Sequence, residues 1–293
     1  MTGDALFLGV DGGATRSRAR IRDASGRLFG EGLAGPANSR LGITATMKEV
    51  VAAARAALAT GALPETDLGR LHAGLGLAGV TGGREAELIL AEPHPFASVA
   101  VDSDAYAAWL GACGGKDGAI LIVGTGSCGL AVVGRRRINV GGWGDVVSDD
   151  GSGNAIGRTA LRRALWTLEG LAPPGALADA LLEKFKRDPE AIVAWAAAAT
   201  KTDFARFAPL VFDHAARREP LAQALVQEAA GHIGRMAGRL IDCGAPSVAL
   251  IGGMAEAIEP WLPPPVRQRL VPPLADAVDG AIVMARERAG FPR

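Results

Sequence analysis

The residues best suited to chemistry form a turn at the end of the first apolar stretch. Five nearly continuous apolar residues, 6–10, predict a buried strand, and the sequence Asp-Gly-Gly-Ala-Thr follows at 11–15. Glycine has no Cβ, so backbone N–H groups can close on a ligand there, and neighbouring N–H groups form an anion-binding nest. The turn therefore predicts a phosphate-binding site whose carboxylate, Asp11, stands at the strand end.

The elements that would position this turn occur twice. Residues 6–31 predict a strand, the glycine turn, a strand, a second turn and a short strand, and residues 119–140 repeat that order around a Gly-Thr-Gly-Ser turn at 124–127. Rossmann and Walker sites differ, because their glycine turns lead directly into a helix. Ligands of open α/β sheets bind at the carboxyl ends of strands. The repeat therefore predicts two related α/β domains that bind a nucleotide.

The rest of the chain alternates between strand and helix patterns. Periodicity and turn residues predict further strands and helices. The strands are expected at 70–78, 98–101 and 248–251. The helices are expected at 43–60, 105–113, 155–168, most of 175–243 and 274–289, with a short helix that follows the turn 79–83 and ends at 91. Prolines at 263–265 and 272–273 predict an extended loop. The alternating arginines 16, 18, 20 and 22 are interpreted as a solvated strand face.

Composition excludes several classes of protein. The 293 residues are 49% hydrophobic and 21% charged, enough for two compact domains with sizeable cores. Lys and Arg together number 31, as do Asp and Glu, so the chain lacks the basic excess of a nucleic-acid or membrane-surface protein. No apolar run reaches the ~20 residues of a membrane span. With no secretory leader pattern, a reducing cytoplasm is expected.

Cysteine usage indicates neither a disulfide framework nor a zinc site. The three cysteines, Cys113, Cys128 and Cys243, are odd in number and far apart, and none belongs to a C-x-x-C pair.

Taken together, the ordered stretches resemble a known group of ATPases. The chain is similar to the sugar kinase/actin/heat-shock ATPase superfamily, and within it to the N-acetylglucosamine kinases and bacterial glucosamine kinases, grouped with the BadF/BadG/BcrA/BcrD ATPases. One glycine turn alone is common, whereas the ordered set is specific. The matching stretches, which span nearly the full length, are 10–15, 37–38, 77–79, 103–105, 124–127, 141–144, 149–153 and 251–253.

The resemblance implies a fold and an activity. It implies two ribonuclease-H-like α/β domains flanking a cleft for ATP, Mg²⁺ and a sugar, with closure on the ligands. The first domain would be 1–115, completed by a C-terminal helix at about 280–293, and the second 116–279 with a helical insertion. The implied reaction is ATP-dependent phosphorylation of D-glucosamine, or of N-acetyl-D-glucosamine, at the 6-hydroxyl. A homodimer is also implied.

The resemblance also implies residue roles. Asp104 would be the general base, and Asp11 would orient the hydration shell of Mg²⁺. The phosphate and nucleotide contacts would come from Gly12, Gly13, Thr15, Gly124, Thr125, Gly126, Ser127, Gly252 and Gly253. The sugar contacts would come from Asn38, Asp104, Trp143 and Asp149.

Each of these residues also has a structural interpretation. Asp104 opens a helix and could be its N-cap, while Asp102 is interpreted as a turn residue. Asn38 could simply form a loop, and Asp149 or Asp150 could serve the next helix N-terminus. Trp143 could be a packed hairpin tryptophan.

The chain departs from the mammalian pattern at one sugar contact. Mammalian N-acetylglucosamine kinases carry Ser before a glycine where this chain has Ala78-Gly79. Bacterial glucosamine kinases resemble this chain there, which favours a free-amine substrate. Two other activities on the same fold remain open: an activator ATPase of a radical dehydratase, which needs a cysteine-bound cluster, and a sugar sensor, which needs a DNA-binding extension. Other amino sugars, such as N-acetylmuramic acid, stay open as substrates.

Overall fold

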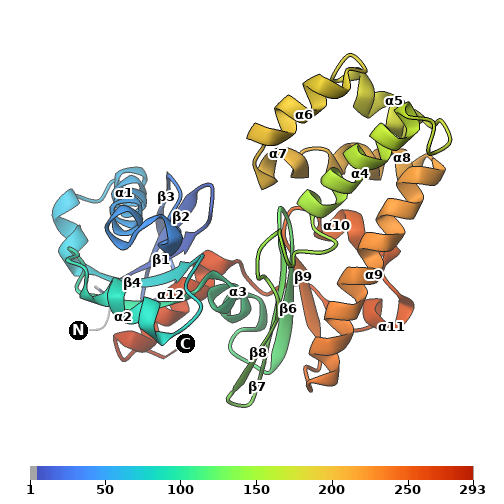
Figure 1. Cartoon of the computed structure of the whole chain (residues 1–293). Coiled ribbons are helices and arrows are strands. Elements are labelled where there is room, and N and C mark those ends of the chain that lie inside the picture. The colour runs from blue at the N-terminus through green and yellow to red at the C-terminus, as the bar shows by residue number, and fades with distance from the viewer. Residues whose placement is uncertain (1–4, 293) are drawn as a thin grey trace. The chain divides into compact units, whose positions relative to one another are not determined.

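The computed structural model describes residues 5–292, and the chain divides into two compact units (Figure 1). Unit 1 comprises Met1–Asp117 with Pro272–Arg293, and unit 2 comprises Gly118–Val271. Each unit contains a five-stranded mixed sheet. The sequence expectation placed the first boundary near residue 115 and the C-terminal return near residue 280, whereas the structure divides after Asp117 and returns at Pro272.

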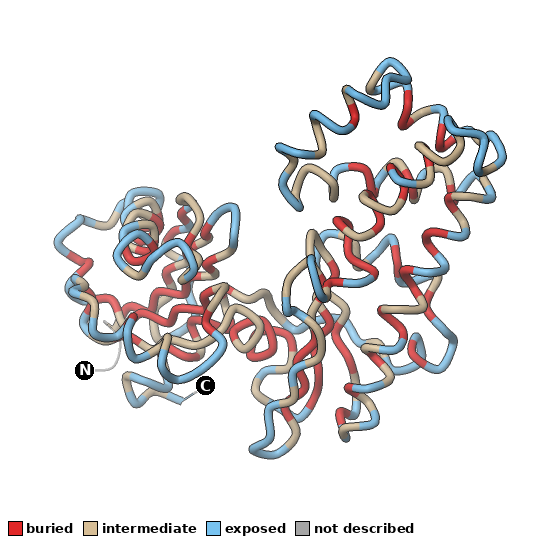
Figure 2. The backbone as a smooth tube through the Cα atoms, viewed as in Figure 1, coloured by how far each residue is buried: buried red, intermediate tan, exposed pale blue. Residues whose placement is uncertain are grey.

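The sheet of unit 1 has the order β3-β2-β1-β4-β5. Its strands are β1 (Leu6–Gly12), β2 (Ser17–Asp23), β3 (Leu28–Ala34), β4 (Leu71–Leu77) and β5 (Ser98–Ser103). The first three are antiparallel neighbours, and β4 and β5 run parallel to β1. The central strands are buried on both faces, which explains why they read as nearly continuous apolar runs (Figure 2).

The helices of unit 1 cover this sheet. They are α1 (Ile43–Thr60), α2 (Gly83–Ala91), α3 (Asp104–Cys113) and α12 (Ala277–Arg288), with short 3₁₀ helices η1 (Ser39–Leu41) and η2 (Glu65–Arg70). Helix α1 packs against β2 and β3, and α12 packs against β1, β4 and α3. The last helix of the chain therefore belongs to the core of the first unit.

Glycines allow α12 to approach the sheet closely. A Cβ on Gly9 or Gly74 would overlap the α12 backbone at the carbonyls of Val278 and Ala281, respectively. Gly280 of α12 in turn faces the carbonyl of Ala107 on α3. Backbone-to-backbone packing of this kind leaves no room for even a methyl group, because protein interiors are close-packed.

The sheet of unit 2 repeats the topology of the first. Its strands are β6 (Gly118–Val123), β7 (Ser127–Val133), β8 (Arg136–Gly141), β9 (Val248–Ile251) and β10 (Leu270–Val271). Read as β8-β7-β6-β9-β10, they have the same order and the same directions as β3-β2-β1-β4-β5. The internal repeat and the α/β class expected from the sequence are thus confirmed.

Unit 2 adds a layer of helices between β8 and β9. They are α4 (Gly153–Leu168), α5 (Ala176–Glu183), α6 (Pro189–Ala198), α7 (Lys201–Ala205), α8 (Ala208–Ala216) and α9 (Pro220–Asp242). Helix α9 begins with Pro220 in its first turn, a position that proline tolerates, and the Glu219 side chain caps it by accepting from the N–H of Ala222 at 2.6 Å. The helical prediction for 175–243 is confirmed.

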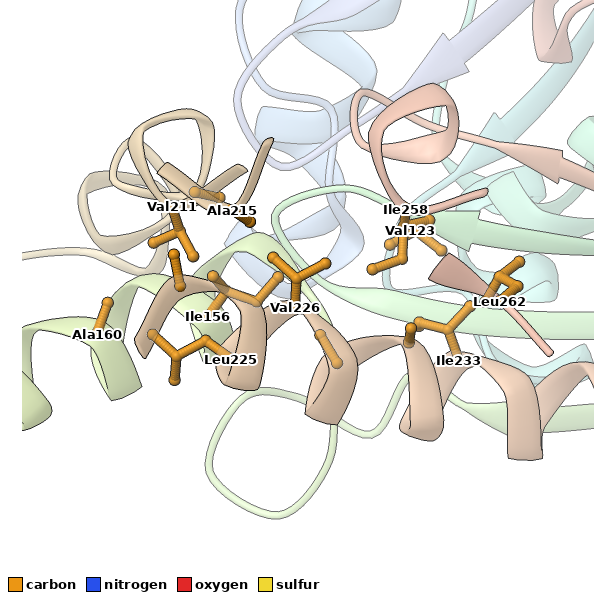
Figure 3. Packing of buried hydrophobic residues seen from close by; sticks show 14 of the residues in the cluster. Val123, Ile156, Ala160, Val211, Ala215, Leu225, Val226, Ile233, Ile258 and Leu262 are labelled. Atoms are coloured by element: carbon orange, nitrogen blue, oxygen red, sulfur yellow. The ribbon is translucent and has the colours of Figure 1, made fainter. Parts of the chain in front are cut away.

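The core of unit 2 forms where α9 meets its neighbours. Leu225, Val226 and Ile233 are one, seven and eight positions apart and therefore share one buried face of an amphipathic helix. Figure 3 shows them packed with side chains of α4, α8 and the end of β6 in one buried cluster. The cluster also receives Ile258 of α10 (Ala255–Ile258) and Leu262, which follows η3 (Glu259–Trp261). This core supports the turn after β6.

The proline-rich segment differs from its prediction. Instead of an extended loop, it contains helix α11 (Pro264–Arg267) and strand β10. Pro264 and Pro265 stand in the first turn of α11, where no N–H is needed and the fixed φ suits a helix. Among residues 5–292, no helix is long and apolar enough to cross a membrane.

Candidate functional site

Strand pairing in unit 1 brings two acidic positions to one edge of the sheet. Asp11 of β1 is opposite Gly76 of β4, and Gly76 is opposite Asp102 of β5. Because the three strands are parallel, their carboxyl ends lie together. We call this edge, formed by the ends of β1, β4 and β5, the carboxyl edge of unit 1. Asp104 follows β5 directly and opens α3.

Asp104 is not the N-cap of α3, the structural role that its position suggested. Ser103 is the N-cap of α3, and its hydroxyl accepts from the N–H of Tyr106 at 3.1 Å. The N-cap interpretation of Asp104 is therefore wrong. Asp102 lies inside β5 rather than in a turn, and its carboxylate accepts from the N–H of Ser103 at 2.8 Å.

The surroundings of Asp104 favour the protonated form of its carboxyl group. Burial raises the pKa of its carboxyl above the ordinary value, and the negative charge of Asp11 raises it further. The N–H of Ala105, which donates to Asp104 Oδ1 at 2.8 Å, opposes this shift. A carboxylate with a raised pKa is suited to accept a proton near neutral pH.

Asp11 is paired with an arginine across the first hairpin. β1 and β2 place Asp11 opposite Arg18, and Arg18 donates to Asp11 Oδ2 from Nε at 3.2 Å and from Nη2 at 2.7 Å. Further along β2, Arg20 and Arg22 pair with acidic residues at the start of α12. The expectation of a solvated arginine face is wrong for these three side chains, which are partly buried in ion pairs.

The turn after β1 uses some of its groups internally. A Cβ on Gly12 would lie 2.5 Å from Leu77 Cδ2 and 2.7 Å from the carbonyl of Ala37, so packing requires this glycine. The N–H of Gly13 donates to the carbonyl of Arg16 at 3.0 Å and closes the turn. Thr15 is exposed, which leaves its side chain accessible.

Asn38 comes to the carboxyl edge through a bridge to the end of β4. It forms an isolated parallel bridge with Ala78, and the N–H of Ser39 donates to the carbonyl of Ala78 at 3.0 Å. Its side-chain oxygen caps η1 by accepting from the N–H of Arg40 at 3.0 Å. Gly79 has φ +87°, and a Cβ there would lie 2.6 Å from Asn38 Oδ1. Asn38 and the Ala78-Gly79 pair, both expected near the sugar, therefore lie next to each other in unit 1.

In unit 2, the second glycine turn is attached to the start of α4. The N–H of Gly153 donates to the carbonyl of Gly124 at 2.8 Å, and that of Asn154 to the carbonyl of Thr125 at 3.2 Å. The helix is capped by Ser152. A Cβ built on Gly124 would have no heavy atom within 4 Å among the described residues beyond its chain neighbours. The turn is thus anchored beside a helix N-terminus, which favours anions, and is open at Gly124.

Asp149 packs against this turn. It is 6% exposed, it has φ +64°, and a Cβ on Gly126 would lie 2.7 Å from its Oδ2. Burial raises the pKa of the Asp149 carboxyl, against the opposing charge of Lys201 and the N–H of Ser127. The neighbouring Asp150 is exposed, and its carbonyl accepts from the Ser127 hydroxyl at 2.8 Å. That hydroxyl proton is therefore used inside the protein.

The remaining predicted residues of unit 2 differ in how far packing explains them. Gly252 has φ +104°, and a Cβ there would overlap the carbonyl of Val123, whereas Gly253 is open. Trp143 is 66% exposed on the loop after β8, so its interpretation as a packed tryptophan is wrong. Its indole is available to a ligand.

The acidic residues fit a cation held mainly by water and phosphate. Among residues 5–292 there is no group of three or more His, Cys, Asp and Glu side chains that could hold a metal ion. Mg²⁺ commonly keeps several waters and needs only one or two carboxylates alongside substrate phosphates, so Asp11 alone is compatible with it. Cys113, Cys128 and Cys243 form no disulfide among the described residues, and burial raises the pKa of the Cys113 thiol to about 11.

Sequence reasoning missed the Arg18–Asp11 pair and the capping role of Ser103. Both had a signal in the sequence. Closing the first hairpin at Gly12 and Ser17 places Asp11 opposite Arg18, and serine directly before a helix is a typical N-cap.

Comparisons with known proteins find chains that are similar to this one over most of its length. The glucosamine kinase GspK of Vibrio cholerae is 39% identical over 279 residues, covering 95% of each chain. The N-acetyl-D-glucosamine kinase of Dictyostelium discoideum is 26% identical over 249 residues, covering 77% of this chain and 76% of that one. A crystal structure of a candidate N-acetylglucosamine kinase from Chromobacterium violaceum superposes with a TM-score of 0.89 at 34% identity, covering 96% of this chain and 99% of that chain.

A family model matches nearly the whole chain as well. The match covers residues 8–285, which include both glycine turns, Asp104 and α12 up to Ala285. The chain therefore belongs to the BadF/BadG/BcrA/BcrD ATPase family.

Proposed function

We propose that this protein is an ATP-dependent hexosamine kinase that phosphorylates D-glucosamine at its 6-hydroxyl, with N-acetyl-D-glucosamine as the second candidate. The similarity to a glucosamine kinase over 95% of both chains supports the class of reaction. The single observation that carries the mechanism is Asp104. It is an acidic side chain at the carboxyl edge of unit 1 whose pKa is raised and whose capping role is filled by Ser103.

In the proposed reaction, Asp104 accepts the proton of the sugar hydroxyl. The hydroxyl oxygen forms a bond to the γ-phosphorus of ATP, the bond between that phosphorus and the β–γ bridging oxygen breaks, and ADP leaves. Phosphoryl transfer needs positioning and charge stabilisation more than covalent chemistry. Removal of the proton as the oxygen attacks is the step that a carboxylate base can accelerate.

The glycine turns are the proposed contacts for the nucleotide. In unit 1 these are Gly12, Gly13 and Thr15, of which Thr15 is accessible. In unit 2 they are the turn 124–127, supported by the N-terminus of α4, and Gly252 with Gly253 near the adenosine. Mg²⁺, when bound, would neutralise phosphate charge, and Asp11 is the residue proposed to orient its waters.

Polar groups around Asn38 and Asp149 are the proposed contacts for the sugar. Hydrogen bonds to sugar hydroxyls give strong selectivity, because an analogue lacking a hydroxyl leaves buried polar groups unpaired. The exposed indole of Trp143 offers an apolar surface for a sugar ring. Ala78, which offers no hydroxyl beside Gly79, supports the free-amine substrate over the N-acetylated one. A homodimer and a cytoplasmic location remain predictions.

Substitution of the proposed base tests this function directly. Asp104→Asn preserves size but cannot accept the proton, so we expect kcat with glucosamine to fall by about 10²–10⁴-fold while Mg·ADP affinity changes little. Asp102→Asn, two residues earlier in β5, is the matched control and should keep most activity. Near-normal kcat in Asp104→Asn would remove the base assignment. Absence of glucosamine phosphate among the wild-type products, measured by ³¹P NMR, would remove the substrate assignment.

A further inference from the structure

The pair between Arg18 and Asp11 is unusual in its geometry. Both guanidinium donors reach the same carboxylate oxygen, Oδ2, from Nε at 3.2 Å and from Nη2 at 2.7 Å. A fork-to-fork pair would instead use both oxygens of the carboxylate. Arg18 therefore neutralises Asp11 from one side and does not bind Oδ1.

Arg18 also lies near an acidic residue at the start of α12. Its Nη1 lies 3.7 Å from Asp276 Oδ2. Asp276 is the N-cap of α12 and also binds Arg20, whose Nη1 and Nη2 lie 2.9 and 3.1 Å from its two oxygens. Desolvation acts against it, but the Asp279 N–H and the two guanidinium groups hold the pKa of Asp276 below its ordinary value. Asp276 thus stays negative beside Arg18.

The next two arginines of β2 also form ion pairs with acidic residues. Arg20 also lies 2.9 Å from Asp279 and 2.7 Å from Glu31, and Arg22 lies 2.8 Å from Asp279. The Asp279 contacts attach β2 to α12 and the Glu31 contact attaches β2 to β3, in both cases without involving Asp11.

An unpaired Asp11 would be unfavourable for an anionic ligand. A carboxylate beside a polyphosphate repels it unless a cation lies between them, and charges in partly buried sites are weakly screened. Asp11 and Asp102 lie at the same edge of the sheet through Gly76, and Asp104 follows β5 directly, so the carboxyl edge already concentrates acidic side chains. A fixed guanidinium on Asp11 reduces that charge when no Mg²⁺ is present.

We propose that Arg18 is a positioning residue that neutralises Asp11 and thereby sets how strongly nucleotide binding depends on Mg²⁺. The inference rests on the proposed function, because it takes the turn after β1 as the polyphosphate site. Without Arg18, Asp11 carries its full charge: ADP alone binds more weakly, and Mg²⁺ compensates. By linkage, the coupling between Mg²⁺ and nucleotide becomes larger.

Calorimetric titration of ADP, with saturating Mg²⁺ and with a chelator instead, tests this without turnover. For Arg18→Gln we expect the Kd of metal-free ADP to rise by about tenfold, whereas the Kd with Mg²⁺ changes by less than about threefold. Arg18→Lys keeps the charge and should lie close to wild type. Equal changes under both conditions, or no change under either, would overturn the proposal.

Two further variants separate this role from a general loss of structure. Arg22→Gln breaks a comparable contact with α12 but leaves Asp11 untouched, so its ADP affinities should match wild type even if its melting temperature falls. The double variant Arg18→Gln with Asp11→Asn should regain metal-free ADP binding, because the uncompensated charge is gone. Failure to regain it would contradict the electrostatic explanation. Wild-type protein that binds no ADP even with Mg²⁺ would overturn the proposed function as well.

Discussion

At the scale of single residues, Ser103 and Asp104 have different roles at the carboxyl edge: Ser103 is the N-cap of α3, and Asp104 is the proposed general base. Ser103 satisfies the helix N-terminus, so the Asp104 carboxylate is not needed as the cap. Burial and the charge of Asp11 then make that carboxylate a better proton acceptor. Ser103 thus provides the N-cap, and the adjacent Asp104 is left for its proposed role as general base.

This arrangement predicts a pH dependence with a definite sign. The pKa of Asp104 lies above the ordinary value of about 3.9. As pH falls through the raised pKa, the carboxyl becomes protonated and cannot act as a base, so kcat/KM for the sugar should decline at a higher pH than an ordinary aspartate would give. Initial rates at saturating Mg·ATP, with circular dichroism as the control for folding, would show this. A rate that stays level down to the ordinary pKa would contradict the assignment.

Two glycines with different surroundings give a second prediction at this scale. Gly124 has open space where a Cβ would lie, whereas Gly252 combines φ +104° with an overlap at the carbonyl of Val123. Gly124→Ala should therefore change unfolding free energy by less than about 0.5 kcal/mol while weakening ADP binding. Gly252→Ala should cost about 1–3 kcal/mol from backbone strain alone. Denaturant unfolding and ADP titration measure both; equal destabilisation of the two variants would show that Gly124 is a packing residue.

The sequence indicated candidate site residues but not the hydrogen bonds that they form. Asp11 was proposed because it stands between a buried strand and two glycines, and Asp104 was proposed from the family resemblance. The engagement of the Gly13 N–H inside its turn, and of the Ser127 hydroxyl by the carbonyl of Asp150, depends on local loop geometry that spacing does not contain. The α12 partners of Arg20 and Arg22, Asp276 and Asp279, are more than 250 positions away in the chain, beyond the reach of any local pattern.

At the scale of elements, α12 is the part of unit 1 most dependent on close packing. It lies across β1 and β4 where glycines replace side chains. Sequence periodicity predicted a terminal helix, but its attachment to the first unit came from the family resemblance. The individual contacts could be identified only from the structure, because a glycine in a strand pattern does not indicate which residue packs against it.

Substituting one of these glycines tests the packing of α12. Gly74→Ala would force its methyl group against the carbonyl of Ala281, and overpacking of this kind typically costs about 1–3 kcal/mol. Gly83→Ala, at the exposed start of α2 with nothing within 4 Å, is the matched control and should be neutral. Urea denaturation compares the two. A Gly74→Ala protein as stable as wild type would mean that α12 does not lie tightly on the sheet.

Helices and strands with clear periodicity were predicted within a few residues. The predicted helix 43–60 coincides with α1, and the helix 155–168 is extended only at its start, where Ser152 caps it. The segment 263–273 failed because clustered prolines indicate a break in general, yet in the first turn of a helix they are favourable. Their position relative to the cap, rather than their number, decides the outcome.

At the scale of the whole molecule, the repeat is the central feature. Two sheets with the same strand order and directions each end their first strand in a glycine turn. The second copy differs by a helical layer between β8 and β9, which builds the core of unit 2. Only the first copy carries an aspartate directly before its glycines, so the carboxylate proposed to orient the waters of Mg²⁺ belongs to unit 1.

The most direct test of the account is a coupled ADP-release assay with Mg·ATP and three sugars in parallel: glucosamine, N-acetylglucosamine and glucose. We expect glucosamine to give the highest kcat/KM, N-acetylglucosamine a lower one, and glucose the lowest, with Asp104→Asn inactive on all three. N-acetylglucosamine in first place would overturn the interpretation of Ala78 while leaving the base assignment intact. No sugar-dependent release of ADP by the wild-type protein would contradict the proposed hexosamine kinase activity.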